Sequence, residues 1–194
     1  FLPLSPTDST GSPYSSPSSF ALNPWFIDID DLIERGSIFI SRKEELISTN
    51  QKMNHFDFDL AEDLSKKIGR LLLQGWSSQS QARKLEFYKW ISKNSWVEDY
   101  ATFVVLREEF NMRPWWQWPQ EFKTKNDKFL KLWIKKKSED VLIKKLIQWH
   151  LDEQWRAIKN FAKSSNVKLI GDLPFYVSRD SADVWSNKSL FSIF

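Results

Sequence analysis

The chain contains no cysteine, two histidines and five glycines among its 194 residues. The lack of cysteine excludes disulfides, thiolate nucleophiles and thiolate metal ligands, and it is typical of proteins in a reducing compartment. His55 and His150 stand far apart, without the spacing of metal ligands, so a zinc or iron centre is not expected. The dispersed glycines match neither a P-loop nor a Gly-rich dinucleotide fingerprint. We therefore expect no metal and no cofactor.

Long apolar runs and a strong charge of one sign are also missing. No stretch approaches the length that crosses a bilayer, and the first residues, FLPLSPTDSTG, lack the basic region and apolar core of a signal peptide. The net charge is only +3, with basic and acidic residues interspersed. The densest basic run, Lys135 to Lys137, stands beside Glu139 and Asp140, which indicates a solvated helix face. Neither membrane insertion nor nucleic-acid binding is expected.

Aromatic residues, in contrast, are abundant: they make up 15% of the chain and include 11 tryptophans. Large rings dominate buried area, so most of them are expected in the core. A surplus of tryptophan also suits stacking on flat, weakly charged ligands such as sugars or bases, and composition does not distinguish the two. For Trp115, Trp116 and Trp118 we expect packing that pins a helical insertion to the wall of a barrel, rather than a sugar platform, and we place Trp185 in the core.

Three regions follow one another along the chain. Residues 5–24 are rich in Ser and Pro and read as an ordered loop, with a disordered linker as the alternative. Residues 30–165 are mainly helical: apolar residues recur at helical spacing in two places, and Ser95 with Glu98 forms a capping box that predicts a helix start at Trp96. The first apolar stripe comprises Leu60, Leu64, Ile68, Leu71 and Leu72, and the second comprises Ile143, Ile147, Leu151, Trp155, Ile158 and Phe161. Residues 167–173, VKLIGDL, read as a strand.

A strand, a long helical crossover and a second strand indicate an α/β fold. In α/β barrels, functional residues lie at the C-terminal ends of strands and in the loops that follow. Two sets of polar residues occupy such positions, Asp8, Ser12 and Tyr14 after the first strand and Asp172, Tyr176 and Asp180 after the second. Each aspartate can equally be a turn or cap residue, and for Asp180 we expect capping of a short helix that starts near Ser181.

Four stretches resemble the 4-α-glucanotransferases, also called amylomaltases or disproportionating enzymes (glycoside hydrolase family seventy-seven). The first is LPLSPTDSTGSPYSSPSSFALNPWFIDIDDL over residues 2–32, and the second is LIGDLPFYVSRDSADVWSNKSLF over residues 169–191. Between them, WVEDYATFVVLREEFNMRPWWQWPQEF and FAKSSNVKLIGD are similar to the family in order and spacing. The resemblance covers nearly the whole chain and is weakest over residues 35–90.

The resemblance implies a (β/α)8 barrel enzyme that transfers α-1,4-glucan segments between malto-oligosaccharides, with glucose as an acceptor. It implies a retaining mechanism without a cofactor. Ser12 and Tyr14 would contact glucose units, and Asp172 would bind sugar hydroxyls. Asp8, Tyr176 and Asp180 are weaker candidates.

The same resemblance implies that this chain is part of a catalytic barrel domain. It would hold the second and third strands: a strand end and substrate loop over residues 1–29, a helical insertion over 30–165, and a strand with its loop over 166–194. The catalytic carboxylates are expected beyond Phe194, so residues 1–194 alone should be inactive. We expect a cytoplasmic or plastid enzyme without an obligate protein partner. The alternative hypothesis is a non-catalytic carbohydrate-binding or decayed scaffold protein.

Overall fold

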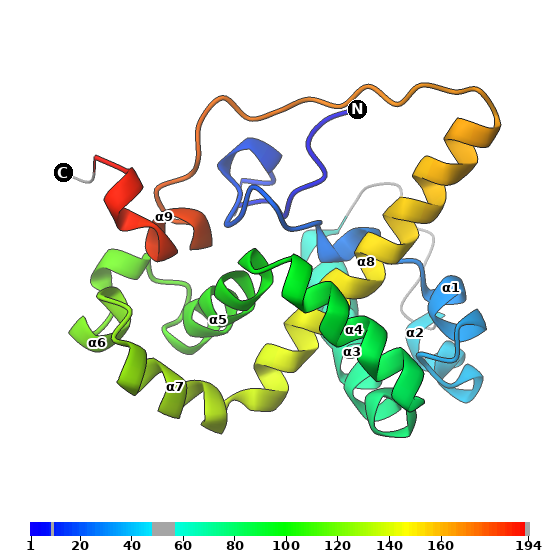
Figure 1. Ribbon diagram of the computed structural model, residues 1–194, viewed down its shortest axis with the longest axis horizontal. Helices are drawn as coiled ribbons and strands as arrows, with labels where there is room; N and C mark the ends of the chain where they lie inside the picture. The colour runs from blue at the N-terminus through cyan, green and yellow to red at the C-terminus, as the bar shows by residue number, and fades with distance from the viewer. Residues whose placement is uncertain (9, 48–56, 193–194) are drawn as a thin grey trace.

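The computed structural model describes residues 1–8, 10–47 and 57–192, and these residues form helices and irregular segments but no strand. Figure 1 shows a body of helices crossed by the long helix α8, with irregular chain along one edge. The helices are α1 Ile29–Glu34, α2 Lys43–Ile47, α3 Phe58–Ser78, α4 Gln81–Lys93, α5 Trp96–Glu109, α6 Gln120–Lys123, α7 Asp127–Lys136, α8 Ser138–Ser164 and α9 Ala182–Ser186. Short 3-10 turns are η1 Pro13–Ser15, η2 Pro24–Phe26, η3 Ile40–Arg42, η4 Trp115–Gln117 and η5 Lys188–Leu190.

The two apolar stripes seen in the sequence form α3 and α8, which pack against each other. Ile68 and Leu72 of α3 are buried with Ile147 and Leu151 of α8 in one hydrophobic cluster. At Gly69 the helices come so close that an added Cβ would stand 2.5 Å from Ile143 Cγ2. The stripe of α8 is only half covered, because Ile158 and Phe161 in its last turns are exposed.

Helix starts follow local hydrogen bonding, with one departure from the sequence prediction. The Asp57 carboxylate accepts from Leu60 N at 2.9 Å at the start of α3, as expected of an N-cap. Helix α5 begins at Trp96 as predicted, but the capping box is not formed. Ser95 has helical dihedral angles and its side chain makes no capping bond, because the backbone already enters the helix through a turn in which Val97 N donates to Asn94 O.

A second cluster, built around α5, holds most of the tryptophans. Trp115, Trp118 and Trp185 are buried there, and Trp116 packs on its edge. Trp185 Nε1 donates to Phe122 O at 2.9 Å, so this indole is satisfied although it is fully enclosed. The core position expected for Trp185 is confirmed, and the other three rings pack within the helical body.

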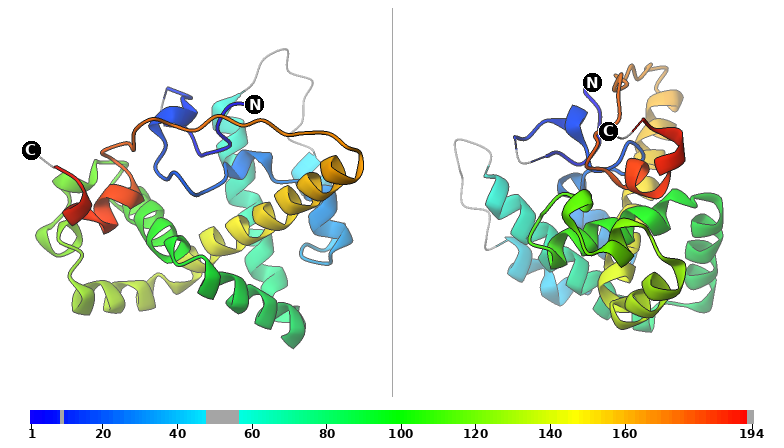
Figure 2. Two further views of the ribbon diagram at one scale, coloured as in Figure 1. Left: turned by 45° about the horizontal axis from the view of Figure 1, so that its top comes forward. Right: turned by 90° about the vertical axis from the view of Figure 1, so that its left-hand side faces the viewer.

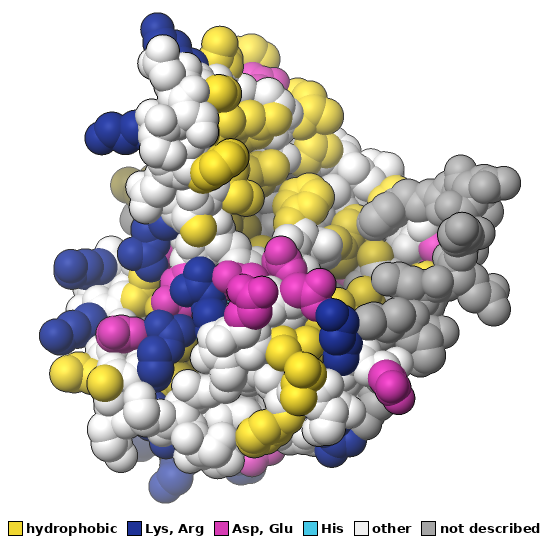
Figure 3. Space-filling view, turned by 90° about the vertical axis from the view of Figure 1, so that its right-hand side faces the viewer, with side chains coloured by type: hydrophobic (Ala, Val, Ile, Leu, Met, Phe, Trp, Pro, Cys, Tyr) yellow, Lys and Arg dark blue, Asp and Glu magenta, His cyan; other side chains and the backbone are white. Residues whose placement is uncertain are grey.

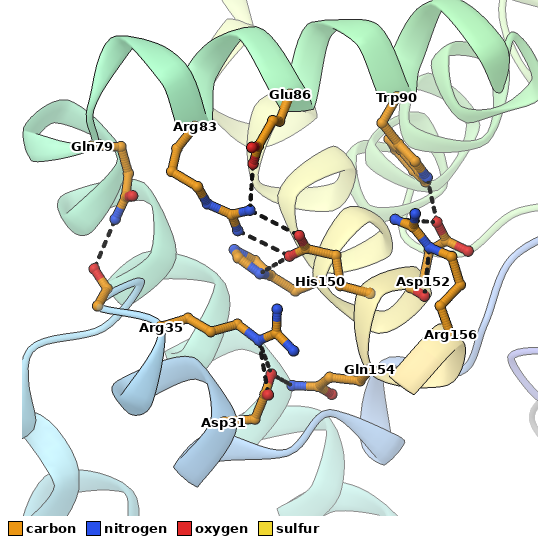
Figure 4. Close-up of polar contacts among 12 residues, drawn as sticks. Asp31, Arg35, Gln79, Arg83, Glu86, Trp90, His150, Asp152, Gln154 and Arg156 are labelled. Carbon is orange, nitrogen blue, oxygen red and sulfur yellow. Dashed lines mark hydrogen bonds and ion pairs between the residues drawn. The ribbon is translucent and has the colours of Figure 1, made fainter. Parts of the chain in front are cut away.

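Ion pairs and hydrogen bonds join α4 to α8 on the other side of the body (Figure 4). The Arg83 guanidinium binds Glu153 through two bonds of 2.8 and 3.0 Å, and Trp90 Nε1 donates to Asp152 Oδ2 at 2.7 Å. Arg83 also lies 4.2 Å above the Trp149 ring. Paired and stacked in this way, Arg83 is held in one geometry.

Two buried glutamines hold the N-terminal chain on α8. Gln148 accepts from Leu22 N at 2.9 Å and donates to Leu22 O at 2.8 Å, and Gln154 binds Asp28 N and O in the same way. Each side-chain amide therefore satisfies both backbone groups of one irregular residue. These contacts fix where the 5–24 loop leaves the helical body.

The strand predicted over residues 167–173 is not confirmed. This segment is irregular and runs beside the N-terminal residues in both Figure 1 and Figure 2. The two segments are joined by a hydrogen bond from Phe1 N to Ile170 O at 2.7 Å. A strand needs a ladder of such bonds, which the described residues do not supply. Ile170, Leu173 and Phe175 are 78%, 81% and 99% exposed, and Figure 3 shows hydrophobic side chains gathered on the upper part of one face.

Two further absences hold for the described residues. No described helix is both long and apolar enough to cross a membrane. Within the same ranges, His, Cys, Asp and Glu side chains form no group that could hold a metal ion. His150 is buried beside Glu153 in the helical body, and His55 lies outside the described residues.

Candidate functional site

The structure brings together two of the predicted site residues, although 158 positions separate them. Tyr14 OH donates to Asp172 Oδ2 at 2.7 Å, and this hydrogen bond is exposed to solvent. The hydrogen bond to Asp172 raises the pKa of the Tyr14 phenol, because losing the proton would place a second negative charge beside the carboxylate. A phenol and a carboxylate in this arrangement offer a donor, an acceptor and a ring face to a polar ligand.

Asp8 and Ser12 shape the turn that carries Tyr14. Asp8 Oδ1 accepts from Thr10 N, Thr10 Oγ1 and Ser12 N at 2.6 to 3.1 Å. Partial burial would raise the pKa of Asp8, but these hydrogen bonds, together with the Arg107 charge, outweigh it and lower the pKa. Ser12 Oγ in turn accepts from Tyr14 N at 3.3 Å and caps η1. Asp8 and Ser12 thus stabilise the conformation of the turn that carries Tyr14.

Buried serines complete the fold of the 5–24 loop. Ser16 Oγ donates to Ser18 O at 2.7 Å, and Ser18 Oγ accepts from Phe20 N and Ala21 N. Ser16 and Ser18 are both buried. The Ser-rich composition therefore supplies side-chain acceptors for backbone N–H groups, and the described part of the loop is folded, as preferred in the sequence interpretation.

Asp180 has a different role from the predicted cap. Helix α9 is capped by Ser181, whose Oγ accepts from Val184 N at 3.2 Å. Asp180 instead accepts from Trp115 N at 3.1 Å and pairs with Arg107 at 3.3 Å. Burial raises the pKa of Asp180, and the Arg107 charge and the Trp115 N–H offset part of this rise. The capping prediction was wrong because long-range partners compete for the carboxylate.

Tyr176 is exposed and makes no hydrogen bond within the described ranges. A cavity of about 310 Å³ lies elsewhere, beneath the base of the 5–24 loop. Its walls include Thr7, Trp25, Glu62, Tyr100, Arg107 and Gln148. Neither Tyr14 nor Asp172 lines it, so the exposed pair and the cavity are separate features.

Comparison with known proteins gives this geometry a context. A family model described as 4-alpha-glucanotransferase matches residues 1–193. The chain belongs to the 4-alpha-glucanotransferase family. It is 32% identical to the 4-alpha-glucanotransferase of Clostridium butyricum over 98% of its own length, and 29% identical over 98% to the chloroplastic/amyloplastic enzyme of Arabidopsis thaliana.

A solved structure agrees. The amylomaltase from Streptococcus agalactiae in complex with acarbose superposes on the whole of this chain with a TM-score of 0.88 and 27% identity. The chain spans 39% of that protein, 38% of the Clostridium butyricum relative and 33% of the Arabidopsis thaliana relative. The family resemblance seen in the sequence is thereby confirmed.

Sequence reasoning missed Arg107 and did not find the partner of Asp183, and both residues connect the site segments to the helical body. Arg107 pairs with Asp180 across the molecule, and Asp183 accepts from Ser19 N at 2.8 Å. Arg107 lies in a helix of ordinary composition, and nothing in its spacing distinguishes it from a solvated base. Asp183 stands in a stretch that matches the family, but its partner is 164 positions away.

Proposed function

We propose that the whole protein transfers α-1,4-glucan segments between malto-oligosaccharides by a retaining mechanism, and that this chain supplies substrate contacts through Ser12, Tyr14 and Asp172. The observation that carries the proposal is the Tyr14–Asp172 pair, exposed in a chain of the 4-alpha-glucanotransferase family. The solved relative is in complex with acarbose, which supports an oligosaccharide as ligand.

The chemistry of the pair suits a sugar. A carboxylate accepts hydrogen bonds from sugar hydroxyls with charge-assisted strength, and the phenol offers both a hydroxyl and an apolar ring. A sugar hydroxyl that replaces Tyr14 on Asp172 would leave the phenol free to donate to a second sugar oxygen. Neither step needs a metal or a cofactor.

The fold proposal places residues 1–4 and 167–173 as two strands of a (β/α)8 barrel, with residues 30–165 as the helical insertion between them. Two observations support it: the Phe1–Ile170 contact joins these segments, and their exposed apolar side chains are of the kind that a sheet would cover. Two strands cannot close a barrel. On the family resemblance, the catalytic carboxylates are proposed to lie outside residues 1–194, in an enzyme of the cytoplasm or a plastid.

Incubation with maltotriose, followed by chromatography, tests the proposal. The whole protein should produce glucose and a ladder of longer oligomers, whereas residues 1–194 alone should produce none. A ladder from residues 1–194 would contradict the proposed location of the catalytic groups. Glucan binding by the whole protein without a ladder would instead support the alternative, a non-catalytic carbohydrate-binding protein.

A further inference from the structure

We propose that Asp183 is a positioning residue that holds the 5–24 loop so that Tyr14 meets Asp172. Asp183 Oδ2 accepts from Ser19 N at 2.8 Å, and the adjacent Ala182 N donates to Pro17 O at 2.8 Å. These two bonds join the loop to the start of α9. For its effect on glucan binding, the inference rests on the proposed function.

The element that carries Asp183 is firmly anchored. Trp185, two residues further along α9, is fully buried and donates from Nε1 to Phe122 O. Ser181 and Ala182 are also buried. Side chains locked by packing give a fixed reference for a hydrogen bond to a loop. Asp183 therefore fixes the position of Ser19 relative to the helical body.

The loop side of the contact leads directly to Tyr14. Pro17 is buried between Ser16 and Ser18, whose side chains bind the loop backbone. Ser16 is also the residue that ends η1, the turn that contains Tyr14. A displacement at Pro17 or Ser19 would consequently displace the phenol.

The segment that carries Asp172 is fastened to the same body. Trp115 Nε1 donates to Arg179 O at 2.7 Å, and Asp180 binds both Trp115 N and Arg107. The loop and this segment thus share one scaffold, built from α5, η4 and α9. Their mutual position is set there, because the single exposed bond between Tyr14 and Asp172 is too weak to set it.

A simpler role for Asp183 would be to favour the start of α9 through its charge. An acidic residue in the first turn of a helix is stabilising, but Ser181 already caps α9. Burial raises the pKa of Asp183, the Ser19 N–H lowers it, and the nearby Asp99 raises it further. Asp183 forms no ion pair in the described ranges, and a partly buried carboxylate without a cation is costly. The hydrogen bond to Ser19 gives the acid a role that a solvated first-turn charge would not have.

The Tyr14 phenol provides the readout. In the whole protein with ¹³Cζ-labelled tyrosine, the Tyr14 signal is assigned by its loss in Tyr14→Phe, and its pKa is followed by NMR. We expect Asp183→Ala to return this pKa to near the ordinary value of 10.0, because Tyr14 leaves Asp172. Asp183→Asn keeps an oxygen acceptor for Ser19 and should retain the raised pKa. Asp127→Ala, which removes an exposed acid from the first turn of α7, should leave it unchanged.

Glucan binding gives a second measurement. Asp183→Ala should weaken maltoheptaose binding by about 5-fold, the equivalent of one hydrogen bond, and should have little further effect once Tyr14 is replaced by Phe. A raised Tyr14 pKa in a folded Asp183→Ala protein would overturn the proposal. If that variant does not fold, a Tyr14 pKa near 10.0 in Asp183→Asn would overturn it, because the charge alone would then matter. The pKa readout needs no glucan, so it remains decisive even if maltotriose is not a substrate.

Discussion

Two polar contacts of this molecule, one an ion pair and the other a hydrogen bond from a neutral phenol, have different surroundings. Arg83 and Glu153 join α4 to α8, whereas Tyr14 and Asp172 join two irregular segments. The Arg83 and Glu153 side chains are only 24% and 13% exposed, and a tryptophan ring covers the guanidinium. The Tyr14–Asp172 pair is open to solvent.

This difference in solvent exposure indicates which contact stabilises the fold and which is available to a ligand. Breaking an enclosed pair leaves a poorly solvated charge without its main partner, which costs free energy. Breaking an exposed pair costs little, because water replaces the lost partner. A site that must exchange its own hydrogen bond for one to a substrate belongs in the second class.

The largest expected effect is therefore on the enclosed pair. Glu153→Leu would leave Arg83 with only its more exposed partner Glu86, and we expect a loss of about 2 kcal/mol of unfolding free energy, between the values for exposed and fully buried pairs. Urea unfolding followed by circular dichroism would measure it. Glu86→Ala removes the more exposed partner of Arg83 and is the matched control, with a loss below about 1 kcal/mol. Equal losses in the two variants would contradict the comparison.

The sequence predicts the helical body well and the contacts between segments poorly. Ile68, Leu72 and Ile147 stand at helical spacing, and local sequence is sufficient to determine such helices. The segment over residues 167–173 has the composition of a strand, but strands also require a neighbour that local sequence does not provide.

The candidate site shows the same limit. Tyr14 and Asp172 could be named from family motifs, and their contact follows from the fold. Asp180 was assigned to a cap on local grounds, whereas its partners are Trp115 and Arg107 in a distant part of the chain. Side-chain pairing at such separations leaves no periodic signal in one sequence.

The next largest effect concerns the exposed pair, where we expect a loss of activity without a loss of stability. In the whole protein, Asp172→Ala should lower the rate of maltotriose disproportionation by about 10- to 100-fold, the equivalent of a charge-assisted hydrogen bond. The melting temperature should remain unchanged, because Asp172 is exposed. Unchanged kinetics would remove Asp172 from the site, and a large fall in melting temperature would show that the exposed pair stabilises the fold.

The last expected effect is the pH dependence of the enclosed pair. Burial alone would raise the pKa of Glu153, but the contacts with His150 and Arg83 dominate and lower it from 4.5 to about 2. A carboxyl whose pKa is lower in the folded state contributes stability above its unfolded pKa and loses it on acidification. The difference in unfolding free energy between the wild type and Glu153→Gln should therefore shrink as the pH falls through 4.5 toward 2. Asp180 and Asp183, whose pKa values are raised, act in the opposite direction, and they cancel in this comparison because both proteins contain them.

A difference that stays constant down to pH 2.5 would mean that the folded state does not stabilise the ionised form of Glu153. The contrast between the enclosed and exposed pairs would then rest on packing alone.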